Sequence, residues 1–260
     1  MVRAATGNGL PPAAPTDARS HVMTDLSPTG SPPQAGDGGF AVVEMFTSQG
    51  CESCPPAEEV LTEIERDARR RGEPVFALGF HVDYWDHLGW PDPYAAAAYT
   101  ARQEAYARAF GTGHLYTPQM VVNGTAEFVG SDRRRAADAI ASALSAPATA
   151  PVGLTVGAAG GGHVAVDYRV DRPPARGMLH VAVVERGLEN DVPRGENAGR
   201  RLRQDNVVRA FTSVGLAAEE GRVDLTVPPD LDPAQASVVG YVQQEGERAV
   251  VGAAAVDVSA

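Results

Sequence analysis

The chain has 260 residues, a hydrophobic content of 43% and a formal net charge of −11. This length allows one large domain or two, and the negative charge argues against nucleic acid and anionic membranes as partners. Every basic residue is an arginine, which excludes a catalytic lysine, and no apolar run is long enough to predict a transmembrane segment.

Residues 1–39 are rich in Pro, Gly and Ala and show no hydrophobic periodicity, so we predict a disordered tail. They contain no apolar core of the kind that a secretory signal needs. We therefore expect no export signal in this sequence and, by default, a cytoplasmic location.

The first patterned stretch is FAVVEMFTSQGCESCPP, residues 40–56, in which a strand-like apolar run leads into a short polar turn. Cys51 and Cys54 follow this turn and are the only cysteines of the chain. On one helical turn such a pair brings two Cα atoms to about 5–6 Å, within disulfide range. We predict that Cys51, close to the positive end of the helix dipole, is the exposed attacking thiolate and that Cys54 is the shielded resolving cysteine.

Glu44 interrupts the apolar run that precedes the turn. If its side chain points inward, it is a buried carboxylate under the dithiol that can relay the proton of the resolving cysteine. The alternative is a position facing solvent on an edge strand. We favour the buried position and count Glu44 among the candidate catalytic residues.

An amphipathic helix is predicted over residues 57–71, with its first turn starting at or near Pro55 and Pro56. A buried strand over residues 75–82 completes a right-handed βαβ unit. The loop DYWDHLGWPDP follows and contains Trp85 and Trp90, the two tryptophans of the chain. Because it leaves the carboxyl end of a parallel strand, it should lie at the same sheet edge as Cys51, where ligands bind in such sheets. We predict that both tryptophans form a substrate wall, with packing onto the core as the alternative.

The next segments predict a helix over residues 93–110, a hairpin over residues 116–130 with the turn Asn123-Gly124, and a helix over residues 131–146. This order of elements is that of the thioredoxin fold. The segments TSQGCESCPPAEEVL, HVDYWDHLGW and YTPQMVVNG resemble a family of uncharacterised bacterial thioredoxin-like proteins, known mainly as a domain of unknown function. TPQMVVNGTAEFVGSD also resembles the cis-proline strand of glutaredoxins.

The resemblance covers residues 40–146 and implies an α/β thioredoxin-like domain. It also implies a cis peptide at Thr117–Pro118 that faces Cys51 and offers backbone groups to a thiol substrate. Members of the family are often exported, which differs from the location expected above.

From residue 150 onward, short alternating runs separated by turn residues predict an all-β, antiparallel, sandwich-like domain. The predicted division is therefore a tail (1–39), a thioredoxin-like domain (40–149) and a β-sandwich-like domain (150–260). The join between the two domains also predicts that a fragment ending near Thr149 folds by itself. We interpret residues 190–206 as an irregular, arginine-rich loop.

These patterns favour a thiol–disulfide oxidoreductase that acts on protein or small-molecule thiols and disulfides without a cofactor or a metal. Candidate substrate-binding residues are Thr117, Pro118, Trp85, Trp90 and His81. One alternative is a copper-binding protein in which Cys51, Cys54 and His81 hold Cu(I). Another is an interaction module in which the dithiol has no redox role. Whether the dithiol reduces or oxidises its partners stays open.

Overall fold

The structure is a computed structural model that describes residues 38–157, 161–246 and 248–258. The predicted disordered tail therefore lies almost entirely outside the described residues. The first half contains β1 (Ala41–Thr47), α1 (Pro55–Arg71), β2 (Val75–His81), the 3-10 helix η1 (Asp83–Leu88), α2 (Ala97–Phe110), β3 (Gln119–Val122), β4 (Ala126–Val129) and α3 (Arg133–Leu144). The second half contains β5 (Val152–Val156), β6 (His163–Val170), β7 (Gly177–Glu185), β8 (Leu188–Val192), β9 (Arg200–Gln204), β10 (Val207–Gly215), β11 (Glu220–Thr226), η2 (Pro233–Gln235), β12 (Ala236–Gln244) and β13 (Val250–Asp257).

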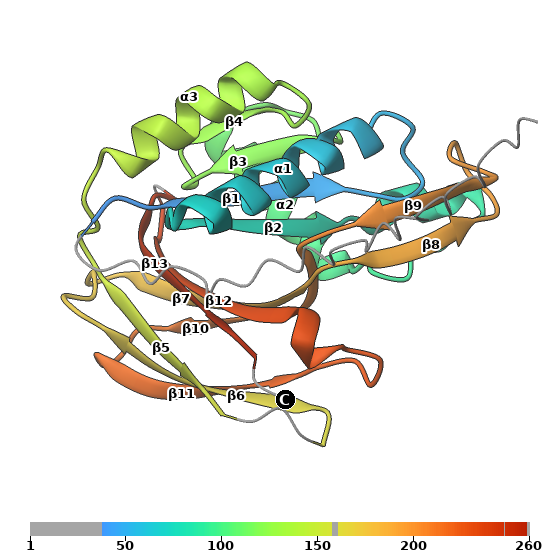
Figure 1. Ribbon diagram of the computed structural model, residues 1–260. Coiled ribbons are helices and arrows are strands. Elements are labelled where there is room, and N and C mark those ends of the chain that lie inside the picture. Colours follow the sequence, from blue (N-terminus) through green and yellow to red (C-terminus); the bar gives the residue numbers. More distant parts are fainter. Residues whose placement is uncertain (1–37, 158–160, 247, 259–260) are drawn as a thin grey trace, which may run out of the picture.

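A mixed sheet of eight strands runs through both halves in the order β13-β12-β7-β10-β2-β1-β3-β4 (Figure 1). β1 and β2 pair in parallel along their whole length, from Ala41–Val75 to Thr47–His81. By contrast, β10 joins β2 through the single parallel pair Val207–Gly79, next to which the Gly79 amide donates to the Asn206 carbonyl oxygen at 2.7 Å. The two halves of the sheet therefore meet at one narrow junction.

Side chains on β1 alternate between two apolar clusters because successive residues of a strand point to opposite faces. Val43 and Met45 pack with α1 and α3 on one face, whereas Val42 and Phe46 pack on the face covered by α2. β1 is buried on both faces along its entire length. This position explains why apolar residues occupy both faces of the strand, which an edge strand facing water would not need.

The cluster on the α2 face is shared by the two halves of the chain. It includes Phe46 and Phe80 from the first half together with Val184 and Tyr241 from the second. A separate apolar cluster lies where the three-stranded sheet β11-β6-β5 packs against residues of β7, β10, β12 and β13. The second half thus has a core of its own and completes the core of the first.

The prediction of strands after residue 150 is confirmed, because β5 to β13 follow there and η2 is the only helix among the described residues of this half. The interpretation of residues 190–206 as irregular is wrong, because β8 and β9 form an antiparallel hairpin there, paired from Leu188–Gln204 to Val192–Arg200. Its strands are charged on their exposed positions, and this masks the alternation of buried side chains such as Val192 and Leu202.

The helices lie close to their predicted positions, and the main difference is at the start of α2. α1 begins at Pro55, because proline suits the first turn, where backbone N–H groups have no partner within the helix. α2 begins only at Ala97, after an extended Ala96, so residues 93–96 are not helical. The aromatic loop forms the 3-10 helix η1, which ends at the left-handed Gly89.

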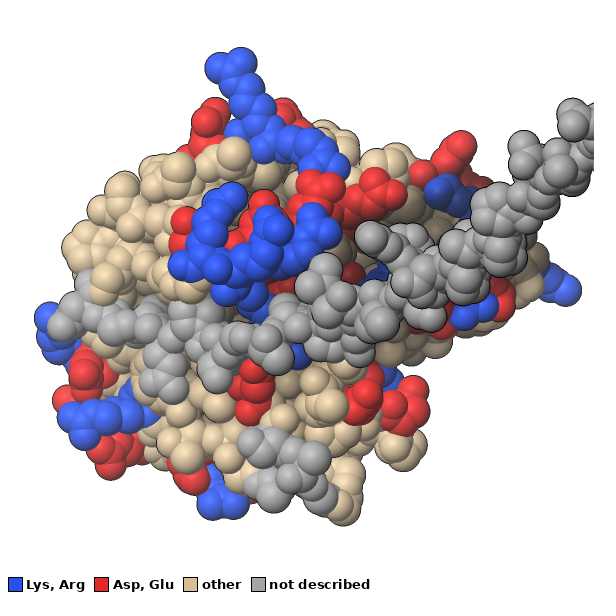
Figure 2. Space-filling model, in the orientation of Figure 1, with Lys and Arg blue, Asp and Glu red and all other residues tan. Residues whose placement is uncertain are grey.

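Arginine side chains gather over α1 and α3 on the face drawn in Figure 2, with acidic side chains among them. Arg70 and Arg71 form ion pairs with Asp67, and Arg133 pairs with Glu63. This surface is therefore a mixture of both signs, and its paired charges contribute little stability because water screens them.

The shared cluster changes the expectation for a fragment that ends near Thr149. Removing the second half exposes Phe46, Phe80 and the free edge of β2, so we now expect this fragment to lack a cooperative unfolding transition. Near-ultraviolet circular dichroism and urea titration of the fragment beside the full chain measure this. A cooperative transition in the fragment would contradict the shared core, and the division of the chain at residue 149 stays a prediction.

Candidate dithiol site

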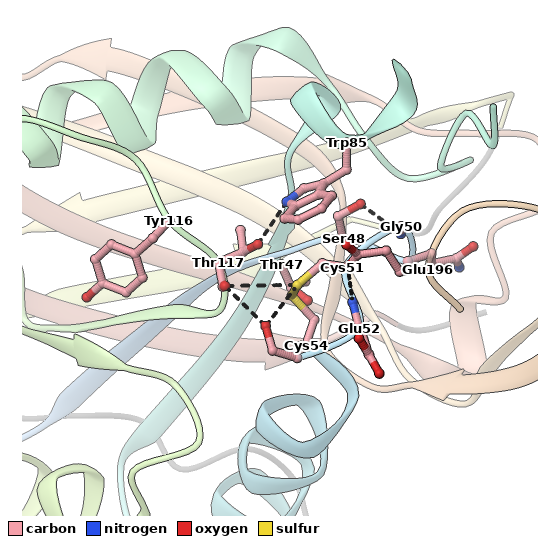
Figure 3. Close-up of a disulfide and its surroundings, with 12 residues drawn as sticks. Thr47, Ser48, Gly50, Cys51, Glu52, Cys54, Trp85, Tyr116, Thr117 and Glu196 are labelled. Carbon is pink, nitrogen blue, oxygen red and sulfur yellow. Dashed lines mark hydrogen bonds between the residues drawn. A yellow bond between two sulfur atoms is a disulfide. The ribbon is translucent and has the colours of Figure 1, made fainter. Parts of the chain in front are cut away.

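Cys51 and Cys54 form a disulfide at the carboxyl end of β1, with their Cα atoms 5.5 Å apart (Figure 3). Cys51 lies in the turn before α1, where its amide donates to the Ser48 carbonyl oxygen, and Cys54 is the N-cap residue of the helix. The pair therefore precedes the helix, whereas the spacing had suggested that the two cysteines share one helical turn. The exposed fraction of Cys51 is 1% and that of Cys54 is 0%, so the predicted exposure of Cys51 is wrong for this oxidised state.

The turn before the cysteines packs closely against the aromatic loop. A Cβ atom on Gly50 would lie 3.1 Å from the Cβ of Trp85, so a larger residue would push the two segments apart. The glycine therefore lets the chain turn beneath the loop on its way to Cys51.

Thr117 lies beside the disulfide, and its peptide bond to Pro118 is cis, as the resemblance implied. The Thr117 carbonyl oxygen is 3.9 Å from the Cys51 sulfur and accepts a hydrogen bond from the Ser53 hydroxyl at 3.4 Å. The Trp85 indole N–H donates to the Thr117 hydroxyl at 2.8 Å (Figure 3). The structure thus brings Thr117, Pro118 and Trp85 together around Cys51.

Trp90 is half-buried, like Trp85, whereas His81 is buried. The Trp90 indole N–H donates to the Gln49 side-chain oxygen at 2.9 Å, which ties the aromatic loop to the turn before the cysteines. His81 is buried, and its Nδ1 lies 2.7 Å from a carboxylate oxygen of Asp92. His81 is therefore placed to support the site from below and does not reach the surface to contact a substrate.

Glu44 is buried, as predicted, with an exposed fraction of 1%. Its carboxylate accepts hydrogen bonds from Arg102 at 2.5 and 2.9 Å and from the Tyr106 hydroxyl at 2.7 Å. Both partners belong to α2, whereas Cys54 leads into α1 on the opposite face of the sheet. The location of Glu44 under the dithiol is therefore wrong, and its proton-relay role has no contact to support it.

A different acid, Glu58, lies on the α1 side of the sheet. The Thr47 hydroxyl donates to its carboxylate at 2.7 Å and the Gln204 side-chain amide at 3.0 Å. Burial raises the pKa of Glu58, although the charge of His81 and these two hydrogen bonds act in the opposite direction. The sequence signal was available, because Glu58 stands four residues after Cys54, between the apolar positions 57 and 61 of α1.

A second buried acid, Asp92, binds the turn that carries the cysteines. Its carboxylate accepts from the Gln49 amide at 2.8 Å as well as facing His81. Burial opposes both charges, yet the mutual attraction prevails: the charge and hydrogen bond of Asp92 raise the pKa of His81, and His81 lowers the pKa of Asp92. A group of buried side chains that can hold and exchange protons therefore lies below the dithiol turn.

The β8–β9 hairpin covers the same turn from the second half of the chain. Asn197 is fully buried, and its amide donates to the Gln49 and Cys51 carbonyl oxygens at 2.9 and 2.8 Å. A carboxylate oxygen of Glu196 accepts from the Glu52 amide at 2.9 Å. The interpretation of this segment as an irregular loop hid these residues from the sequence analysis.

In the described part of the chain, no group of three or more His, Cys, Asp and Glu side chains is arranged to hold a metal ion. His81, the third ligand named for the copper alternative, contacts Asp92 through its Nδ1, so only its Nε2 would be available to a metal ion. Nor is any helix among the described residues long and apolar enough to cross a membrane.

We expect Glu44→Gln to destabilise the protein by about 3–5 kcal/mol, because the buried Arg102 charge would lose its ionic partner. Chemical denaturation measures the loss, and the reduction potential of the cysteine pair should not change. Glu44→Gln combined with Arg102→Met should recover part of the stability. A changed reduction potential in Glu44→Gln would instead support a proton-relay role for Glu44.

The raised pKa of His81 predicts a dependence of stability on pH. Its contribution is present below the unfolded pKa of about 6.5 and is lost as the pH rises through the higher folded value. The difference in unfolding free energy between the wild type and His81→Gln should therefore be largest near pH 6 and shrink toward pH 9. A difference that is constant over this range would show that the His81–Asp92 pair is not ionic.

Comparison with known proteins places the chain in a family. A crystal structure of a protein from Agrobacterium tumefaciens is 30% identical, with a TM-score of 0.63, and the match covers 85% of this chain and 96% of that chain. A domain of the outer membrane lipoprotein Omp28 from Porphyromonas gingivalis is 12% identical over 43% of this chain and 97% of that chain, but its TM-score of 0.28 is too low to carry an argument. No curated protein matches. The model of the family described as "Protein of unknown function (DUF1223)" matches residues 42–243, and the chain therefore belongs to that family.

Proposed function

We propose that the protein is a thiol–disulfide oxidoreductase whose reactive group is the Cys51–Cys54 pair. The observation that carries the proposal is the position of this disulfide between β1 and the first turn of α1, beside the carbonyl oxygen of Thr117. These are the only two cysteines of the chain, so each can form a disulfide within the chain only with the other. The proposed substrates are proteins or small molecules that contain a thiol or a disulfide.

In the reductive direction, the Cys51 thiolate attacks one sulfur of a substrate disulfide. A mixed disulfide forms with that sulfur, the substrate S–S bond breaks, and the other substrate sulfur leaves as a thiolate. Cys54, after loss of its proton, then attacks the Cys51 sulfur, which closes the Cys51–Cys54 disulfide and releases the second substrate thiolate. Two electrons pass from the dithiol to the substrate, and the oxidative direction is the reverse of these steps.

We also propose a thioredoxin-like arrangement for residues 40–149. The order β1-α1-β2-α2-β3-β4-α3 and the strand order β2-β1-β3-β4 support it. The cis-Pro118 opens β3 next to the disulfide, where Thr117 can offer its backbone to an extended substrate. In this proposal, the Trp85 indole N–H holds Thr117 in place by donating to the Thr117 hydroxyl.

Cys54→Ser should trap a mixed disulfide between Cys51 and substrate proteins, because the resolving thiol is missing. Cys51→Ser should trap none. Non-reducing electrophoresis followed by mass spectrometry of the trapped species measures this, with the double serine variant as the control. Trapping by Cys51→Ser alone would reverse the roles of the two cysteines. If neither variant traps a substrate and the wild type does not exchange with glutathione, the proposed function is refuted.

A further inference from the structure

We propose that the tip of the β8–β9 hairpin is a positioning element that sets the reduction potential of the Cys51–Cys54 pair. In this proposal, Asn197 holds the backbone that carries Cys51, and Glu196 places a negative charge beside it. The inference rests on the proposed redox function and deepens it, because it assigns the tuning of the dithiol to the half of the chain that contains no cysteine.

The side chain of Asn197 is held at every polar atom. Its amide nitrogen donates to the carbonyl oxygens of Gln49 and Cys51, at 2.9 and 2.8 Å, and its own oxygen accepts from Arg200 at 2.8 Å. The side chain is also fully buried, so loss of its N–H groups would leave two backbone carbonyls without these partners. Asn197 therefore fastens the backbone on both sides of Gly50.

The other half of the dithiol is fastened by the helix. The Cys54 carbonyl oxygen accepts hydrogen bonds from the amides of Ala57 and Glu58 at 2.9 and 3.1 Å. Reduction breaks the bond between the two sulfurs, which must then separate to a non-bonded distance. Because Asn197 and α1 hold the two backbones in place, this separation is resisted and the disulfide form is favoured.

The charge of Glu196 acts in the same direction. Its carboxylate accepts from the Glu52 amide at 2.9 Å, next to Cys51, and the exposed Glu52 side chain adds a second negative charge to this rim. Negative charges disfavour the Cys51 thiolate that reduction produces at alkaline pH. Since Glu196 is exposed, salt should weaken its effect.

The segment that connects β8 and β9 lies close to the dithiol turn. Gly195 has a left-handed φ of 84°, and a Cβ atom there would lie 3.6 Å from the Cα of Gly50. The hairpin tip and the dithiol turn thus approach each other at two glycines. This close approach lets Glu196 and Asn197 reach the backbone on either side of Cys51.

The test is the equilibrium of the full-length protein with reduced and oxidised glutathione, followed by alkylation and mass spectrometry. We expect Asn197→Ala to shift the equilibrium about tenfold toward the dithiol, which is about 30 mV for a two-electron couple. Glu196→Gln keeps an acceptor for the Glu52 amide and should shift it about two- to threefold in the same direction, less so at high salt. Asp191→Asn removes an exposed charge from the same hairpin and should leave the equilibrium unchanged.

Equal potentials for the wild type, Asn197→Ala and Glu196→Gln would overturn the inference while leaving the proposed function intact. A wild type that does not equilibrate with glutathione would instead remove the proposed function itself. If Asn197→Ala does not fold, the exposed Glu196→Gln decides alone through the salt dependence of its shift. A shift in Asp191→Asn as large as that in Glu196→Gln would show a general effect of net charge and would also overturn the inference.

Discussion

The narrow junction between β2 and β10 is the constraint on which the arrangement of the site depends. The pair Val207–Gly79 and the hydrogen bond from Gly79 to Asn206 attach the second half of the sheet to the first. β9 ends only a few residues before β10, so this attachment also brings the β8–β9 hairpin to the carboxyl end of β1. Without the junction, the sheet would not hold the hairpin tip against the dithiol turn.

The polar interior around the disulfide depends on both halves for the same reason. Gln49 donates to Gln204 at 2.8 Å, and Gln204 donates to Glu58, so a residue of β9 connects the dithiol turn to α1. Buried polar groups of this kind are costly when they lack partners, and the partners here come from segments about 150 residues apart in the chain. The two halves are therefore coupled by satisfied hydrogen bonds as well as by the shared apolar cluster.

The two buried acids show why a site residue can be misplaced by one strand face. Glu44 was predicted to be buried, and it is, but its position in β1 directs it toward Arg102 on α2. Thr47, three positions later, points to the opposite face and binds Glu58 from α1. A buried acid does lie on the dithiol side of the sheet, but the helix that follows the cysteines provides it.

Local patterns in the sequence determined much of the structure: most strands and helices, the turn at Asn123–Gly124 and the pairing of Cys51 with Cys54. These features depend on hydrophobic period, turn chemistry and short spacings, which are readable within a few residues. Only the tertiary structure decided that Cys51 is buried, that Glu58 and not Glu44 lies on the dithiol side of the sheet, and that Asn197 holds the dithiol turn. Those outcomes depend on which faces and edges of separate elements meet in the folded chain, up to 146 residues apart for Asn197 and Cys51, and no local pattern contains that information.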